Sequence, residues 1–271
     1  MALILISSLL FSQIAISLWK KYHPRSYNLT TLLGLWLVPP VLGYRAGNYR
    51  YVTVWVLFSI ANSFVVKKAM ENPMKSGTPG VVYRWYTWVY NISYAVGIVG
   101  YVIMIVTFFH VPILAGMARE TEENIFTGAI TLLFYGLYFG TLGRDFVDRL
   151  SDRMATTMGY YSRTGFPAKH LRSNQCAICG EVTDTSGGAE SRQIGIGTGT
   201  TPKGTVVKVH RLTCGHAFHE QCIRGWTIIG KKDVCPCCKE KVDLKAFKTN
   251  PWDTTQQMYL NLLDALRYMV V

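Results

Sequence analysis

The chain has 271 residues, of which 49% are hydrophobic and 16% charged, and its formal net charge at pH 7 is +12. This length would suit one or two soluble domains, but so apolar a composition argues against a soluble chain. The positive charge alone would suit nucleic-acid binding. Much of it falls where membrane proteins carry cytosolic Lys and Arg, however, so we expect no nucleic-acid partner.

Uncharged runs dominate the first half of the chain. Five of them precede residue 143, more than a soluble fold of this size could bury, so we predict an α-helical multi-pass membrane bundle over residues 1–142. The first run would form a helix about 27 Å long. Lys and Arg follow it rather than precede it, which favours a retained anchor over a cleaved signal peptide. The five predicted spans are residues 2–19, 29–44, 51–66, 85–109 and 125–142.

Two features of these spans leave alternatives open. The second and third runs are short, and the second contains Pro39 and Pro40. This pair therefore either crosses the membrane at a kink or forms a re-entrant hairpin shielded by its neighbours. The fifth run carries Gly136 and Gly140. Their spacing permits close helix packing, either in a dimer face or within the bundle itself.

Lys and Arg are concentrated in alternate connecting segments. They are frequent around residues 20–25, 67–84 and 144–163 and sparse around residues 45–50, whereas residues 119–123 are mainly acidic. Segments rich in Lys and Arg usually face the cytosol. We therefore predict that the N-terminus is lumenal and that the C-terminal half of the chain is cytosolic.

The segments that flank the cysteine-rich part of the chain are predicted to be helical. Residues 143–175 are polar and predict a juxtamembrane linker helix, with Asp145, Asp148 and Asp152 along one side. Residues 239–271 combine a basic segment with a C-terminal amphipathic helix, because apolar residues recur there at helical spacing. We expect this helix to pack on the preceding module or to lie at the membrane surface.

All seven cysteines lie within residues 176–238, and six of them, together with two histidines, have the spacing of metal ligands. A structural zinc ion takes four thiolate or imidazole ligands, so eight ligands predict two zinc ions. A disulfide framework is disfavoured because the cysteine count is odd and paired histidines have no role in one. Spacing alone leaves open whether the ligand pairs join in sequence or interleave. Cys237 is the one cysteine that is not among the eight candidate ligands. The candidate ligands are Cys176, Cys179, Cys214, His216, His219, Cys222, Cys235 and Cys238.

Local patterns predict the elements that carry these ligands. Alternating apolar residues over 205–211 predict a short strand, and residues 220–229 predict one short helix that stops at Gly230. Residues 180–204 are rich in Gly, Ser and Thr and predict a flexible insert. His210 precedes the ligand set, and we interpret it as a surface histidine.

The ligand pattern C-x2-C, C-x-H-x2-H-x2-C, C-P-x-C resembles the RING finger of the H2 subtype at all eight positions. This resemblance implies a small α+β cross-brace fold in which two zinc sites interleave. The first site would then comprise Cys176, Cys179, His219 and Cys222, and the second would comprise Cys214, His216, Cys235 and Cys238.

RING fingers of this kind recruit a ubiquitin-conjugating enzyme charged with ubiquitin and hold its thioester for attack by a substrate lysine. The resemblance therefore implies no catalytic residue here, since such a module acts by positioning and electrostatics. By position in the motif, Ile178, Trp226 and Pro236 would contact the conjugating enzyme. Lys239 would take the place of the cation that bridges enzyme and ubiquitin.

A narrower resemblance covers nearly the whole chain. Residues 222–245, 250–252, 97–101 and 133–138 are similar to the RING finger protein 121/175 family. That family implies a multi-pass membrane ubiquitin ligase of the endoplasmic reticulum and Golgi, linked to quality control of membrane-protein substrates. The chain departs from the family in its glycine-rich insert, and it ends before the family's last hydrophobic segment.

Two other functions remain to be weighed against a ligase. A non-enzymatic membrane scaffold would use the same RING only to assemble other proteins. A transporter or channel would require a polar stripe through the spans, and the two clearest spans contain no ionisable residue. We expect no small-molecule ligand; the expected partners are the conjugating enzyme, membrane-protein substrates and the lipid bilayer.

Overall fold

The structure is a computed structural model and is mostly helical. The chain divides after Ile60 into two compact units. The structure describes residues 13–75, 77–110, 116, 118–159, 175–183, 195–200, 206–230, 232–243 and 251–270.

The first unit is built from helices that lie close to one another in sequence. Residues 13–22 are helical, α2 spans Pro24–Arg45, and α3 spans Tyr49–Ala69 and continues beyond the unit boundary. The Trp36 and Trp55 rings lie 5.3 Å apart, and the Trp55 indole Nε1–H donates to the Trp36 carbonyl at 3.0 Å. These contacts join α2 and α3 as a helical hairpin, and α2 remains helical through Pro39 and Pro40.

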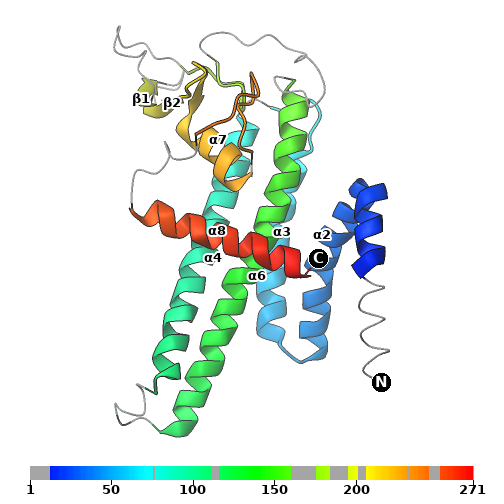
Figure 1. Cartoon of the computed structure of the whole chain (residues 1–271), viewed down its shortest axis with the longest axis vertical. Helices are drawn as coiled ribbons and strands as arrows, with labels where there is room; N and C mark the ends of the chain where they lie inside the picture. Colours follow the sequence, from blue (N-terminus) through cyan, green and yellow to red (C-terminus); the bar gives the residue numbers. More distant parts are fainter. Residues whose placement is uncertain are drawn as a thin grey trace. The chain divides into compact units, whose positions relative to one another are not determined.

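Two longer helices form the centre of the second unit. Helix α4 spans Thr78–Phe108 and α6 spans Arg119–Met158, and they run antiparallel (Figure 1). A Cβ atom added to Gly136 would lie 2.7 Å from the Gly97 Cα atom and from the Ser93 carbonyl oxygen. Glycine therefore lets the two backbones touch. Of the two uses considered for Gly136, the structure shows packing within the bundle.

Among the residues that the structure describes, three helices are long and apolar enough to cross a membrane: α3, α4 and α6. They contain the predicted spans 51–66, 85–109 (to Phe108) and 125–142. The predicted span 29–44 lies within α2, which is not one of the three, and most of the predicted span 2–19 lies outside the described residues. The five-span prediction is therefore supported for three segments.

The juxtamembrane segment is continuous with the last of these helices. Helix α6 passes from its uncharged run into the charged segment that follows and ends at Met158, where Gly159 adopts a left-handed conformation. A single helix therefore carries the end of a candidate span and the first half of the predicted linker. Residues 160–174 of that linker lie outside the described residues.

The cysteine-rich part of the chain, residues 175–243, is called the Cys/His module below. Its strands β1 (Gly195–Thr200), β2 (Val206–Arg211) and β3 (Ala217–His219) form an antiparallel sheet in that order. A short helix α7 (Glu220–Arg224) continues directly into a π-helical turn η2 (Gly225–Ile229). The predicted strand and short helix are thus present, and part of the predicted flexible insert is the strand β1.

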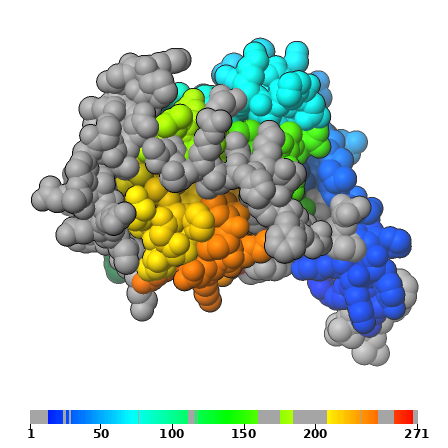
Figure 2. Space-filling view, turned by 90° about the horizontal axis from the view of Figure 1, so that it is seen from above, coloured from blue at the N-terminus to red at the C-terminus, as the bar shows by residue number. Residues whose placement is uncertain are grey.

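The Cys/His module shares a hydrophobic core with α4 and α6. Buried side chains of the two helices, including Tyr83 and Leu150, belong to the same cluster as Ile178, Phe218 and Trp226 of the module. Figure 2 views this end of the molecule from above, with module residues in yellow-green, yellow and orange and residues of the helices in cyan and green. The part of the predicted membrane domain that follows Ile60, the linker and the zinc finger thus belong to one compact unit.

The last helix, α8, spans Pro251–Val270 and crosses α4 and α6 rather than running alongside them (Figure 1). Its buried side chains Tyr259, Leu260 and Leu263 pack with Tyr90 of α4. The Tyr259 hydroxyl donates to the Gly136 carbonyl at 2.9 Å, so α8 contacts α6 as well.

Candidate metal centre

Two tight turns with the same backbone pattern present the C-x2-C ligands. In the first, the Cys176 N–H donates to the Glu181 carbonyl and the Gly180 N–H donates to the Cys176 carbonyl. In the second, Cys235 exchanges the corresponding bonds with Glu240 and Lys239. A single β-bridge closes each turn, Gln175 to Val182 and Val234 to Lys241. Each turn therefore places two thiols at one end of a small bridged loop.

Both turns need a left-handed residue at the same position. Gly180 has φ +73° in the first turn, whereas Lys239 has φ +63° in the second. A left-handed conformation costs a residue with a Cβ atom about 1–2 kcal/mol, while glycine adopts it freely. The conformation of Lys239 is thus set by the turn that holds Cys235 and Cys238, whatever role its charge has.

The remaining four ligands lie on the β2–β3 hairpin and on α7. Gly215, with φ +82°, allows the chain to reverse, and the Leu212 N–H donates to the His216 carbonyl across the turn. His219 ends β3 and caps α7, and Cys222 follows within that helix. Cys214 and His216 therefore lie at the hairpin turn, whereas His219 and Cys222 lie at its far end.

The eight ligand atoms meet in two groups of four, and within each group they lie within 4.8 Å of one another. Zinc bound tetrahedrally at 2.0–2.3 Å needs ligand atoms about 3.3–3.8 Å apart. Cys179 Sγ lies 3.2 Å from His219 Nδ1, and Cys214 Sγ lies 3.3 Å from His216 Nδ1. The groups comprise Cys176, Cys179, His219 and Cys222, and Cys214, His216, Cys235 and Cys238. This is the interleaved arrangement, one of the two that spacing left open.

The thiol chemistry of both groups suits a divalent cation. Burial, together with the neighbouring Cys235 and Cys238, raises the pKa of the Cys214 thiol to about 12. Several thiolates held this close repel one another, which disfavours deprotonating the thiols together. A bound cation offsets this repulsion because it takes the thiolates as ligands. Soft thiolates and imidazoles in fours are the donor set that zinc prefers, so both groups are suited to zinc.

The leftover thiol Cys237 belongs to neither group among the described residues. It lies between Pro236 and Cys238 on the second turn and is partly exposed. His210 differs from its sequence interpretation: it is 4% exposed rather than on the surface. On β2 it pairs with Phe218 of β3, and burial lowers its pKa. Val209 is buried on one face of this strand, and on the opposite face Lys208 is exposed whereas His210 is buried, which the alternation did not predict.

Helices α4 and α6 pack against the module. The Gly77 N–H, just before α4, donates to the Cys179 carbonyl at 3.0 Å and so touches the first turn. A Cβ atom added to Gly225 would lie 2.4 Å from the Tyr83 ring. The Tyr83 hydroxyl donates to the Ser151 hydroxyl at 3.1 Å. The start of α4 and the end of α6 thus pack against the segment that carries Trp226.

The acidic side of α6 pairs with cations from the module and from α8. Lys232 Nζ lies 2.8 Å from Asp152 Oδ1 and 3.2 Å from Asp148 Oδ1. Burial alone would lower the pKa of Lys232, but the hydrogen bonds and charges of these carboxylates outweigh burial and raise it. Arg267 of α8 pairs with Asp145 at 3.0 Å. The spacing of the three aspartates, three and then four residues, was visible in the sequence, whereas their partners were not.

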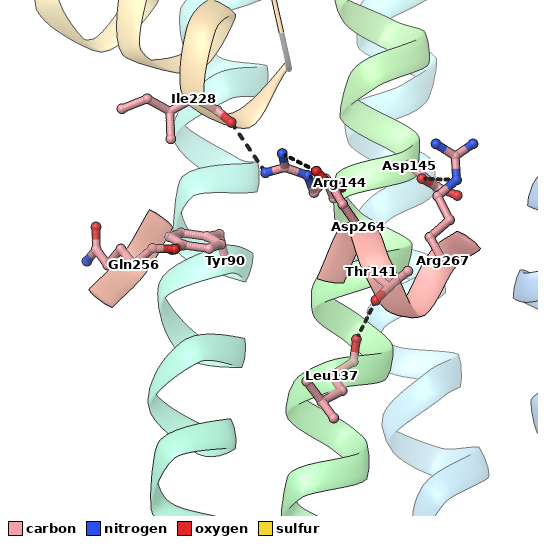
Figure 3. A network of polar contacts seen from close by, with 9 residues as sticks. All are labelled: Tyr90, Leu137, Thr141, Arg144, Asp145, Ile228, Gln256, Asp264 and Arg267. Carbon is pink, nitrogen blue, oxygen red and sulfur yellow. Dashed lines mark hydrogen bonds and ion pairs between the residues drawn. The ribbon is translucent and has the colours of Figure 1, made fainter. Parts of the chain in front are cut away.

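Arg144 joins three elements at the base of the module (Figure 3). Its guanidinium donates to both carboxylate oxygens of Asp264 on α8, and its Nη1 donates to the Ile228 carbonyl of η2 at 3.3 Å. In the sequence Arg144 is only one of the Lys and Arg residues that follow the fifth predicted span, and its pairing with Asp264 was not predicted because 120 residues separate them and neither belongs to a motif.

The residues expected to meet a conjugating enzyme are largely buried. Trp226 is 1% exposed and donates its indole Nε1–H to the Val234 carbonyl at 2.8 Å. Ile178 is 6% exposed and Pro236 is also buried, whereas Lys239 is exposed. Ile178 and Trp226 belong to the core cluster shared with α4 and α6. In this arrangement only Lys239 of the four is open to a partner.

Comparison with known proteins identifies the module. Residues 202–239 match the Ring finger domain family. The match covers the ligands from Cys214 to Cys238, and the structure adds Cys176 and Cys179 from upstream to complete the first group. No solved structure matches the chain. A RING finger of the H2 type is therefore present in a mostly helical chain with three candidate membrane-spanning helices.

Proposed function

We propose that the chain is a membrane-embedded RING-type ubiquitin ligase that recruits a ubiquitin-conjugating enzyme and promotes ubiquitin transfer to substrate lysines. The observation that carries this proposal is the joining of a RING finger to candidate spans. Eight metal-ligand atoms meet in two groups, and the module that holds them shares one core with α4 and α6. A ligase built in this way would act close to a membrane surface.

In the proposed reaction the substrate lysine amine attacks the thioester carbonyl between ubiquitin and the conjugating enzyme. An amide bond forms and the enzyme's cysteine thiol is released. The RING finger contributes by orienting the thioester, so no residue of this chain forms a covalent intermediate. Zinc, when bound, holds the two turns and the hairpin in register. Lys239 at the end of the second turn is exposed and supplies a cation that can reach acceptors on a partner.

The finer parts of the proposal rest on sequence resemblance and charge distribution. Similarity to the RING finger protein 121/175 family supports membrane-protein quality control in the endoplasmic reticulum or Golgi. The alternation of Lys- and Arg-rich segments supports a RING finger in the cytosol and a lumenal N-terminus. Membrane proteins would then be the substrates, recognised beside or within the bilayer.

One observation favours a second candidate, a non-enzymatic membrane scaffold. Ile178 and Trp226, which would contact a conjugating enzyme, are buried in the core shared with α4 and α6. A ligase must therefore loosen this packing to expose them, whereas a scaffold could keep it. The two candidates thus differ in whether freeing the module creates activity.

The test uses the full chain, reconstituted in lipid nanodiscs and assayed for autoubiquitination with a panel of conjugating enzymes. Replacing Lys232 by Glu sets a third negative charge against Asp148 and Asp152 and should loosen the module from α6. We expect K232E to increase ubiquitin transfer. The double variant K232E/D152K restores an ion pair and should return transfer to the wild-type rate.

Trp226→Ala is a poor discriminator because removing a fully buried tryptophan costs about 3–5 kcal/mol of stability. The scaffold becomes the better explanation if neither the wild type nor K232E transfers ubiquitin with any conjugating enzyme while both retain two zinc ions. Equal transfer by the wild type, K232E and the double variant would instead show that docking on α6 does not limit activity.

A further inference from the structure

Helix α8 presents three different faces, and each has different surroundings. The inner face, with Tyr259, Leu260 and Leu263, is buried against α4 and α6. A Cβ atom added to Gly140 would lie 2.9 Å from the Tyr259 hydroxyl and 3.1 Å from Leu263. Because Gly140 has no side chain, α8 can pack directly against α6 where it crosses the helix pair.

Helix α8 crosses α4 and α6 close to the residues at which their sequences change from uncharged to charged. On α6 the uncharged run ends at Gly143, and the Tyr259 hydroxyl bonds to the Gly136 carbonyl about two turns before it. On α4 the uncharged run begins after Arg84, and the Tyr90 hydroxyl donates to the Gln256 carbonyl less than two turns beyond it. If α4 and α6 span a membrane, α8 lies where the hydrocarbon meets the headgroups.

The second face of α8 is polar and faces the Cys/His module. Gln257, Asn261 and Asp264 are spaced four and three residues apart and so share one side of the helix. Asp264 accepts both hydrogen bonds from Arg144, whose third bond goes to the Ile228 carbonyl of the module (Figure 3). This side therefore faces the aqueous end of the spans.

The third face of α8 is apolar and uncovered. Met258 is 67% exposed and Leu262 is 47% exposed, and with half-buried Leu266 they recur every four residues. Because the polar face is turned toward the module, this stripe points the other way, along the spans. The spans themselves also expose apolar side chains, such as Ile92 on α4 and Phe134 on α6. Burying a leucine or methionine side chain in an apolar medium contributes about 1.5–3 kcal/mol.

We propose that α8 is an in-plane membrane helix whose Met258, Leu262 and Leu266 enter the acyl region of the bilayer that α4 and α6 cross. Its polar side stays in the headgroup and water layer, as in other interfacial amphipathic helices. Through Arg144 the helix is tied to the Cys/His module, so it sets the height of that module above the membrane. This inference rests on the part of the proposed function that places α4 and α6 in a bilayer.

The test places the photoreactive residue p-benzoylphenylalanine at single positions of the full chain in nanodiscs of phosphatidylcholine and phosphatidylglycerol. After illumination, mass spectrometry identifies whether each position has cross-linked to lipid. Replacing Met258 or Leu262 should give several-fold more lipid adduct than replacing Asn261, the matched control beside Leu262 on the polar side. Phe134 and Ile92 serve as lipid-facing references, and zinc content shows that each variant is folded.

The outcomes separate the two proposals. Lipid adducts at 134 and 92 but none at 258 and 262 would overturn the interfacial helix and leave the spans in place. An absence of lipid adducts at all four positions would overturn the membrane-spanning proposal itself. Adducts from 258 to a second copy of the chain would show that this face is a protein interface and would also overturn the inference. Equal lipid adducts at 261 and 262 would overturn the assigned orientation of α8.

Discussion

Arg144 and Asp264 form a two-point ion pair: Nε lies 3.0 Å from Oδ1 and Nη2 lies 3.1 Å from Oδ2. The pair joins α6 to α8, and the third donor of the same guanidinium reaches the Ile228 carbonyl in the Cys/His module. One arginine therefore connects a candidate span, the C-terminal helix and the RING finger.

The energetic coupling of this pair can be measured by a double-mutant cycle. We expect R144Q and D264N each to destabilise the chain, because each leaves a partly buried charge without its partner. The double variant should be less destabilised than the sum of the two, with a coupling energy of about 1–3 kcal/mol. Thermal or denaturant unfolding in detergent gives these values, and strict additivity would contradict the coupling. R144Q should also free the Ile228 carbonyl, whereas D264N should not.

Close packing of α4 and α6 depends on Gly136. Its missing side chain faces the Gly97 backbone at 2.7 Å, so G136A must push the helices apart. Overpacking of this kind costs about 1–3 kcal/mol. Gly128 on the same helix has no atom within 4 Å of an added Cβ, so G128A should leave stability unchanged or slightly raised. Equal melting temperatures for the two variants would disprove close contact at Gly136.

The two ligand groups predict the zinc content of single-cysteine variants. Cys238 belongs to the second group and its neighbour Cys237 to neither. We expect C237S to retain two zinc ions per chain and C238S to lose the ion from the second group, since a structural site needs all four ligands. Elemental analysis of the purified full chain measures this ratio. Loss of zinc from C237S, with retention in C238S, would exchange the roles of the two cysteines.

Lys239 allows charge and backbone conformation to be separated. Its φ of +63° is strained for lysine, and Gly180 holds the corresponding position in the first turn. K239G should therefore keep both zinc ions and raise stability by about 1 kcal/mol. If the lysine charge assists ubiquitin transfer, the same variant should transfer more slowly. K239R, which keeps the charge, should retain activity, and a loss of zinc in K239G would show that the side chain itself supports the turn.

The Lys232 contacts predict a dependence of stability on pH. Its pKa in the folded chain is raised above the ordinary value of 10.5, since Asp152 and Asp148 outweigh the effect of burial. The stabilisation is therefore fully present below about pH 10.5 and is lost as the pH rises through the folded pKa. K232M should be less stable than the wild type by about 1–3 kcal/mol at pH 7–9, and the difference should shrink above pH 10.5. Unfolding curves across this range measure it, and a difference that does not change with pH would contradict the ion pairs.

The sequence alone determined the features that depend on local chemistry. The identity and spacing of the eight ligands, the short strand and helix that carry them, and the apolar runs of α3, α4 and α6 all follow from neighbouring residues. Thiolates and imidazoles bind zinc by their nature, and an uncharged run long enough to cross a bilayer is visible as such.

The tertiary structure decided how these parts combine, because contacts between distant residues leave no local pattern. Gly225 against Tyr83 and Lys232 against Asp152 bring the module onto α4 and α6 and bury Trp226, although its motif position implied a partner-facing side chain. His210, interpreted from the sequence as a surface residue, is likewise buried in the folded chain. The helical stripe of α8 was visible in the sequence. Its orientation depends on the ion pair between Asp264 and Arg144, which are 120 residues apart in the sequence. This pair decides which face of α8 contacts the bundle, which faces the module and which stays exposed.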